Sequence, residues 1–311
     1  MKRVLLTGAT GFVGANLARR LLQDGHEVHG LVRPQHQTWR IDDIRGQVRW
    51  HEVSLEDGDG VAAAVGRIRP EWIFHLAAYG AYPEQTDLKR IMAVNFTGTV
   101  NLVEASLKSG FEAFVNTGSS SEYGYKDHAP AETEWLEPNS HYAVSKAAAT
   151  QFCRFTAQKT KTNIQTLRLY SVYGPYEEPT RLIPTVIRRA LTQGDLPPLV
   201  NPTIARDFVY VDDTVNAYLK AAVSLSHEPG AIYNVGTGQQ TTVADVVDAA
   251  RKLFHTKAEP RWNSMADRQW DTGIWVANVQ KIKNVLGWEP VVRFDRGFQS
   301  AAAWWKENPR P

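Results

Sequence analysis

Short apolar runs, separated by stretches with helical periodicity, dominate the first half of the chain. Five of them are centred on apolar residues: Val4–Leu6, Val28–Val32, Trp72–Leu76, Ala113–Asn116 and Gln165–Leu169. Short runs without polar alternation are typical of parallel strands that are buried on both faces. Their alternation with helical segments predicts an α/β fold, a Rossmann-type doubly wound parallel sheet.

The pattern changes after Gly174, where a series of prolines breaks the chain into short elements. Among these elements only Ile183–Gln193 shows clear helical periodicity. Further on, Asp207–Val211 and Ile232–Val235 are predicted to be strands that rejoin the main sheet. From about Thr241 onward the residues favour a smaller helical lobe.

These patterns predict two interleaved domains. Residues 1–174 would form a dinucleotide-binding domain, to which residues 207–236 return. Residues 175–206 and 237–311 would form a smaller, discontinuous C-terminal substrate lobe. The chain has 311 residues, of which 43% are hydrophobic, and this is enough to bury the cores of two lobes.

Composition argues against several classes of partner. The net charge of +2 gives no reason to expect nucleic acid or a membrane surface, and no run of about 18 apolar residues predicts a membrane span. The chain enters a strand almost at once, so we expect no signal peptide and a cytoplasmic protein. The single Cys153 excludes an intramolecular disulfide. None of the nine histidines has metal-site spacing, so no metal is expected.

Three glycines with the spacing Gly-x-x-Gly-x-x-Gly follow the first predicted strand and precede a helical pattern. Such a turn lets the backbone approach a pyrophosphate, which the free N–H groups and the positive dipole end of the helix stabilise. A plain strand-to-helix turn is the alternative, but the position between a strand and a helix favours nucleotide binding. The expected cofactor contacts are Gly8, Thr10, Gly11, Phe12, Val13 and Gly14.

The end of the second predicted strand bears on the choice of cofactor. Folds that prefer NAD usually place an acid here, which hydrogen-bonds the ribose 2′-hydroxyl. Val32 occupies that position and Arg33 follows it. A guanidinium suits a 2′-phosphate because it can bind through two donors. We therefore predict NADP(H), and a solvated loop arginine is the alternative.

Tyr142 and Lys146 lie four residues apart in a segment that is predicted to be helical, so they share one helix face. A free tyrosine has a pKa of about 10 and exchanges protons poorly at neutral pH. A nearby ammonium favours the phenolate and would bring the pKa of the tyrosine toward the working range. This spacing alone is also common on solvated helix faces, so its meaning depends on the accompanying motifs.

Several motifs occur in one order along the chain: Thr7–Gly14, His75–Ala78, Asn95, Ser119–Gly124 and Tyr142–Lys146. Together they resemble the extended short-chain dehydrogenase/reductase family, in its nucleotide-sugar epimerase/dehydratase branch. The segments Arg206–Asp213 and Leu286–Pro290 are also similar to that branch, so the resemblance covers nearly the whole chain. It implies further cofactor contacts at four positions: Leu55, Leu76, Ala77 and Ala78.

The resemblance also implies a catalytic set. Ser119, at the carboxyl end of a predicted strand, would hydrogen-bond the reacting oxygen of the substrate, and Ser120 is the alternative one position on. Tyr142 would donate or accept the proton. Lys146 would hold the nicotinamide ribose and lower the pKa of Tyr142. Asn95 would support the Tyr142 helix, whereas His75 is expected to be a core histidine.

The residues after Ser119 separate the reaction types of the family. Dehydratases usually carry a carboxylate one or two places further on, where this chain has Ser120 and Ser121. Glu122 comes one place later and, along a strand, would face the opposite side. Dehydration is therefore disfavoured.

Similarity to GDP-4-keto-6-deoxymannose reductases and the presence of Arg33 favour an NADPH-dependent reductase of a nucleotide-linked 4-keto-6-deoxy sugar. A 4-epimerase that recycles its cofactor is the alternative, and a non-catalytic dinucleotide sensor is a third hypothesis.

Cations in the second half of the chain suggest how a nucleotide-diphosphate sugar is held. By resemblance, Arg206 and Arg268 clamp the diphosphate, and Arg188 is a further candidate. Ser171 replaces an asparagine that is frequent in relatives, which removes one amide contact. The resemblance further implies a homodimer that pairs through Asn95–Ser109 and Tyr142–Lys159.

Overall fold

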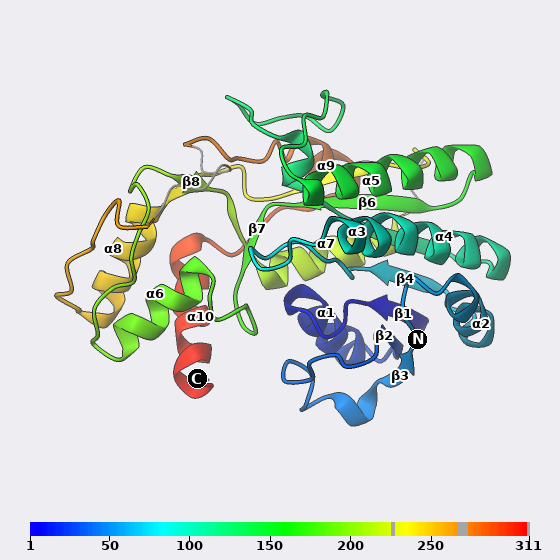
Figure 1. The fold of residues 1–311 in the computed structure, drawn as a ribbon, viewed down its shortest axis with the longest axis horizontal. Helices are drawn as coiled ribbons and strands as arrows, with labels where there is room; N and C mark the ends of the chain where they lie inside the picture. Colours follow the sequence, from blue (N-terminus) through cyan, green and yellow to red (C-terminus); the bar gives the residue numbers. More distant parts are fainter. Residues whose placement is uncertain (225–227, 266–272, 310–311) are drawn as a thin grey trace.

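A computed structural model describes residues 1–224, 228–265 and 273–309 (Figure 1). Its centre is a seven-stranded parallel sheet with the strand order β10-β6-β5-β4-β1-β2-β3. The strands are β1 (Arg3–Thr7), β2 (Glu27–Val32), β3 (Arg49–Glu52), β4 (Trp72–His75), β5 (Ala113–Ser119), β6 (Ile164–Leu169) and β10 (Ile232–Val235). The predicted doubly wound α/β fold is confirmed.

All five predicted strands of the first half are present. The strand β3 was not predicted, because its sequence Arg-Trp-His-Glu carries no apolar run and lies at the edge of the sheet. An edge strand needs less apolar surface than a central one. The strand order changes direction between β1 and β4, which is the position where open α/β sheets bind their ligands.

Helices cover both faces of the sheet. One face carries α1 (Phe12–Gln23) and α7 (Val211–Val223), whose apolar residues share a core with the strands. The other face carries α2 (Gly58–Ile68), α4 (Gly98–Ser109) and α5 (His141–Thr160). A short helix α3 (Leu88–Met92) and a π-helical turn at Ala93–Thr97 lead into α4. No helix of the described ranges is long and apolar enough to cross a bilayer.

The smaller lobe has a core of its own. It is built from α6 (Leu182–Leu191), α8 (Val243–Phe254) and α10 (Phe294–Glu307), which Figure 1 shows together at one end of the molecule. A two-stranded antiparallel sheet of β8 (Ala205–Arg206) and β11 (Thr241–Thr242) joins this lobe.

Two segments depart from the predicted arrangement. The strand β9 (Phe208–Tyr210) does not rejoin the main sheet; it pairs with β7 (Ser171–Tyr173) in a separate parallel sheet. The helix α9 (Gln280–Leu286) packs against β10, and its apolar residues join the core of the large domain. Trp288 also belongs to the core of the large domain, and its Nε1 donates to the Asp213 carbonyl on α7 (3.0 Å). The predicted lobe therefore does not contain all of 237–311.

Candidate active site

The turn between β1 and α1 brings a helix N-terminus to the point where the strand order changes. Gly8 has φ +70, and a Cβ there would lie 2.6 Å from the Ala77 backbone nitrogen. At Gly14 a Cβ would lie 2.1 Å from the Gly8 carbonyl oxygen. Only glycine fits both positions, since real Cβ atoms do not approach so closely. The two glycines let β1, β4 and α1 meet at one edge of the sheet.

This edge fits a dinucleotide. A Cβ on Gly11 would contact only the Gly8 carbonyl oxygen, at 3.2 Å, so the space before the helix is open to a phosphate. The first N–H groups of α1 have no intrahelical partner and point into that space. Thr10, Phe12 and Val13 complete the turn, which agrees with the predicted contacts.

The other predicted cofactor residues lie at the carboxyl ends of neighbouring strands. Leu76 and Ala77 are partly exposed and Ala78 is exposed, directly after β4. Leu55 is nearly buried after β3. Arg33 is the exposed residue that follows β2, and no ion pair holds it within the described part of the chain. The structure therefore gathers these residues at one edge of the sheet.

His75 is confirmed as a core histidine. Its Nδ1 hydrogen-bonds Thr7 Oγ1 (2.7 Å) and its Nε2 hydrogen-bonds Thr99 Oγ1 (2.9 Å). Burial lowers the pKa of His75 to about 3, so its ring is neutral at physiological pH. The histidine links β1, β4 and α4 beneath the cofactor edge.

Ser119 and Tyr142 come together at the end of β5. Ser119 is the last residue of that strand, and Tyr142 lies in the first turn of α5, which Ser140 caps through a bond from the Ala143 N–H (3.1 Å). The Ser119 hydroxyl bonds the Ser121 hydroxyl (2.7 Å) and accepts from the Ser121 N–H (3.2 Å). Burial raises the pKa of Tyr142 to about 12, and the nearby Ser119 hydroxyl acts in the opposite direction. The expected lowering of this pKa is wrong, because the loss of water around the phenol outweighs it.

Lys146 lies one turn further along α5 and is 2% exposed. Burial lowers its pKa, while the charge of Glu122 acts against this. Among the described residues, none forms a hydrogen bond with its ammonium group. An ammonium group with free donors can bind a further acceptor, so the position fits a ligand hydroxyl.

Glu122 lies behind Ser119, next to α5, in an internal hydrogen-bond network. It belongs to a 3₁₀ turn after Ser119, and its carboxylate accepts bonds from the Ser119 N–H (2.8 Å), the Thr150 hydroxyl (3.0 Å) and Arg168 Nε (2.8 Å). Glu122 and Arg168 are both fully buried. The carboxylate is therefore committed to an internal ion pair, because burial without a partner would be costly. The expected turning away of Glu122 is wrong: the turn directs its carboxylate toward α5, where it bonds Thr150 one turn beyond Lys146, and its charge acts on Tyr142 and Lys146.

Asn95 connects two parts of the site. It lies in the π-helical turn before α4, where its amide bonds the backbone N–H (2.8 Å) and carbonyl (2.7 Å) of Tyr79. The same amide donates to the Ser145 hydroxyl on α5 (2.9 Å). The loop around Tyr79 is thus fixed to the Tyr142 helix, which agrees with the supporting role expected for Asn95.

Trp275 joins the catalytic strand to the predicted substrate side, and the sequence analysis did not find it. Its Nε1 donates to Ser120 Oγ (3.1 Å), and the Arg206 guanidinium lies 5.6 Å from its ring. Asp207 helps to hold this segment, since it accepts bonds from the backbone N–H groups of Thr237 (2.7 Å), Gly238 (2.9 Å) and Ala277 (3.0 Å). Asp207, directly after Arg206, was the residue in the sequence that could have pointed to this contact.

The remaining predicted substrate residues are less closely gathered. Ser171 begins β7, and its N–H donates to the Asp207 carbonyl (3.0 Å), beside Arg206. Arg188 lies on α6, with its guanidinium 5.7 Å from the Trp305 ring in the smaller lobe. Arg268 falls outside the described residues. Of the predicted set, Ser120 and Arg206 therefore meet at Trp275, and Ser171 lies beside them.

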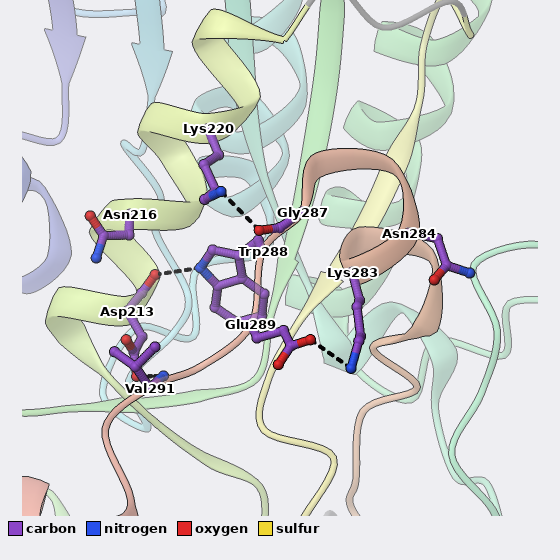
Figure 2. A pocket seen from close by; sticks show the side chains of 9 residues that line it. All are labelled: Asp213, Asn216, Lys220, Lys283, Asn284, Gly287, Trp288, Glu289 and Val291. Atoms are coloured by element: carbon purple, nitrogen blue, oxygen red, sulfur yellow. Dashed lines mark hydrogen bonds and ion pairs between the residues drawn. The ribbon is translucent and has the colours of Figure 1, made fainter.

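A cavity of about 570 Å³ lies elsewhere, between α7 and the segment that follows α9 (Figure 2). Its polar groups are occupied internally: Lys220 donates to the Gly287 carbonyl (2.8 Å), and Lys283 pairs with Glu289 (2.5 Å). Within the described ranges, no group of three or more His, Cys, Asp or Glu side chains is arranged to hold a metal ion.

Comparisons with known proteins agree with this architecture. Residues 4–236 match the model of the NAD dependent epimerase/dehydratase family. A UDP-glucose 4-epimerase of Mycolicibacterium smegmatis is 28% identical over 317 residues, which cover 98% of this chain and 99% of the relative. The solved UDP-glucose 4-epimerase of Thermotoga maritima, with UDP-glucose, has a TM-score of 0.90 and 25% identity and covers 99% of both chains. That of Thermus thermophilus, complexed with NAD, has a TM-score of 0.86 and 29% identity, covering 98% of this chain and 99% of that chain.

Proposed function

Because the chain belongs to the NAD dependent epimerase/dehydratase family, we propose that it is a nucleotide-sugar 4-epimerase that retains and recycles its nicotinamide cofactor. The observation that carries this proposal is the similarity of the chain over its whole length to UDP-glucose 4-epimerases, with Ser119 at the end of β5 and Tyr142 in the first turn of α5. UDP-glucose is accordingly the first substrate to test.

In this proposal the protein moves one proton and holds the sugar. Tyr142 takes the proton of the sugar 4-hydroxyl on oxidation and returns it on reduction, and Ser119 hydrogen-bonds the same oxygen. Lys146 offers its ammonium to a ribose hydroxyl of the cofactor. A bound nicotinamide cofactor would supply the hydride acceptor and donor for carbon 4, and epimerisation requires that the hydride returns to the opposite face of the sugar.

The role of the phenol fits its raised pKa. A tyrosine with a pKa near 12 is a weak acid, so it holds its proton between the two half-reactions. In this proposal Ser119 and the ammonium of Lys146 favour the phenolate when the sugar hydroxyl is to be deprotonated. Turnover should therefore rise with pH across the neutral and alkaline range.

Glu122 supports epimerisation over dehydration. Loss of water from a sugar needs a second acid and base beside the serine and tyrosine, and the carboxylate next in sequence is held by Arg168. Ser120 and Ser121 cannot replace it near neutral pH. The structure thus supplies one proton-transfer residue at this edge, which is sufficient for reversible oxidation at one carbon.

A reductase of a nucleotide-linked 4-keto-6-deoxy sugar is the second candidate, and Arg33 is the observation that favours it. The guanidinium is exposed after β2 and suits the 2′-phosphate of NADPH. We expect Arg33→Ala to weaken NADPH binding about tenfold and NADH binding much less. Equal losses in a fluorescence titration would show that Arg33 does not select the cofactor.

One assay separates the two candidates. UDP-glucose is added to the cofactor-loaded protein, the product is analysed by chromatography, and absorbance at the reduced-nicotinamide band is followed. Conversion of the sugar without net change in absorbance is the expected result. Stoichiometric loss of NADPH absorbance with a 4-keto-6-deoxy nucleotide sugar would instead identify a reductase.

We further propose a homodimer that pairs through α4 and α5. On α5, Val144 (43% exposed) and Phe155 (63% exposed) lie eleven residues apart, about three helical turns, so they share one face. Large apolar side chains on one exposed face are typical of a contact surface. Light scattering should give twice the chain mass, and Phe155→Asp should lower it to one chain.

A further inference from the structure

Glu177 is a buried acid that the proposed mechanism does not use. It lies in the loop of residues 174–181 that connects β7 to α6, and it is 7% exposed. Its Oε2 has no hydrogen-bond partner among the described residues. Because an unpartnered buried acid costs free energy, such a group in a cleft is a candidate for ligand contact.

The connecting loop of residues 174–181 borders the active site. Its Pro175 carbonyl accepts a bond from Asn16 Nδ2 (3.0 Å), in the first turns of α1. Its Arg181 donates to the Ala81 carbonyl (3.4 Å) and lies 5.2 Å from the Tyr82 ring. The loop therefore contacts both the cofactor helix and the segment that precedes α3.

The same segment reaches the catalytic phenol. A Cβ on Gly80 would lie 3.5 Å from the Tyr142 ring, and the charge of Arg181 lowers the pKa of Tyr142. Arg181 acts in the same direction on Glu177. Arg181 thus acts electrostatically on both Tyr142 and Glu177, and its guanidinium is held at the segment around Tyr82.

We propose that Glu177 is a specificity-determining residue, whose carboxyl group hydrogen-bonds a sugar hydroxyl and disfavours a sugar that carries a carboxylate. This rests on the proposed nucleotide-sugar activity. A protonated carboxyl group can donate a hydrogen bond to a hydroxyl, and an ionised carboxylate can only accept one from it, so a contact with a sugar hydroxyl is possible in either state. Two carboxylates at one site repel each other, which sets a penalty against an acidic sugar.

The protonation state of Glu177 makes the penalty dependent on pH. Burial raises the pKa of Glu177 to about 8, so the group becomes charged in the mildly alkaline range. The charged or titratable groups that act on it, or on which it acts, come from its own loop and three neighbouring segments: Glu178, Arg181, Arg40, Tyr82 and Tyr173. Arg40 is already engaged with Glu178 (2.8 Å), and Arg181 with the Ala81 carbonyl.

The test compares UDP-glucose with UDP-glucuronate, which differ by a carboxylate. Their kcat/KM values are measured between pH 6.5 and 9 for the cofactor-loaded wild type, Glu177→Gln and the control Glu178→Gln. We expect the wild-type preference for UDP-glucose to increase about tenfold over this range, as a second charge appears. In Glu177→Gln the preference should not change with pH. Glu178→Gln should follow the wild type, because Glu178 is already paired with Arg40.

Two results would overturn the proposal: a preference in Glu177→Gln that follows the wild type at every pH, or an equal change in Glu178→Gln. Failure of the proposed function itself has a different signature. If the wild type converts neither sugar, calorimetry of both sugars with the wild type and Glu177→Gln still decides the role of Glu177. Equal affinity ratios at pH 6.5 and 9 in the two proteins would then contradict it.

Discussion

Two buried glutamates near the active site show how differently the same residue type can be used. Glu122, in the turn after β5, accepts hydrogen bonds from Ser119, Thr150 and Arg168. Glu177, in the connecting loop of residues 174–181, leaves Oε2 without a partner among the described residues. The first carboxylate is a structural part of the sheet edge, and the second is available to a ligand. Burial alone therefore does not reveal the role of an acid.

The local structure explains the difference. Glu122 lies in a capping box, so its carboxylate is returned to the backbone of Ser119 within three residues. The connecting loop is held by other residues than Glu177. Tyr176, with φ +67, packs on Trp304 (ring centroids 4.7 Å) and beneath the Arg19 guanidinium (3.8 Å). Because its neighbours fix the loop, Glu177 can remain buried while its Oε2 has no partner among the described residues.

The largest effect is expected on turnover, when the phenol of Tyr142 is removed. Tyr142→Phe keeps the ring but removes the exchangeable proton, so kcat should fall by roughly 10² to 10⁴. Steady-state assays with UDP-glucose measure this. Tyr218→Phe is the matched control, since it also removes a buried tyrosine hydroxyl, bonded to Thr117, on α7. Near-normal turnover of Tyr142→Phe would refute the assigned role.

Loss of the Glu122 charge should chiefly affect stability. Glu122→Gln leaves the guanidinium of Arg168 buried beside a neutral amide, so we expect the free energy of unfolding to fall by about 3 kcal/mol. Urea denaturation measures this. The partly exposed pair of Glu178 with Arg40 provides the control, and Glu178→Gln should cost less than about 1 kcal/mol. Equal losses in both variants would mean that the buried Glu122–Arg168 pair stabilises the fold no more than the Glu178–Arg40 pair does.

A further effect is a gain, and it concerns Glu177. Its pKa is raised from 4.5 to about 8, so the folded protein keeps a proton that the unfolded chain loses. The free energy of unfolding therefore decreases as the pH rises from about 4.5 to about 8. Glu177→Gln removes this decrease, and its melting temperature should exceed that of the wild type at pH 8 but not at pH 4.5. An equal difference at both pH values would contradict the assigned burial.

Much of the fold could be predicted because parallel strands are apolar on both faces. The glycine turn and the Tyr142–Lys146 spacing were likewise visible, since each depends on residues close together in sequence. The strand β3 was missed because its residues are mostly polar. The strand β9 was assigned to the wrong sheet because three residues are too few to indicate which strand they pair with. Trp275 was missed since its contacts, Ser120 and Arg206, are distant in sequence.

The sequence by itself determined the sheet, the glycine cradle and the order of the catalytic residues, because periodicity and short-range spacing encode them directly. Only the tertiary structure decided which glutamate is paired, where Trp275 lies and how burial shifts the pKa of Tyr142. Those properties depend on the partners and the water that surround a side chain. Arg168, the partner of Glu122, lies 46 residues away in sequence, so no local pattern predicts the pair.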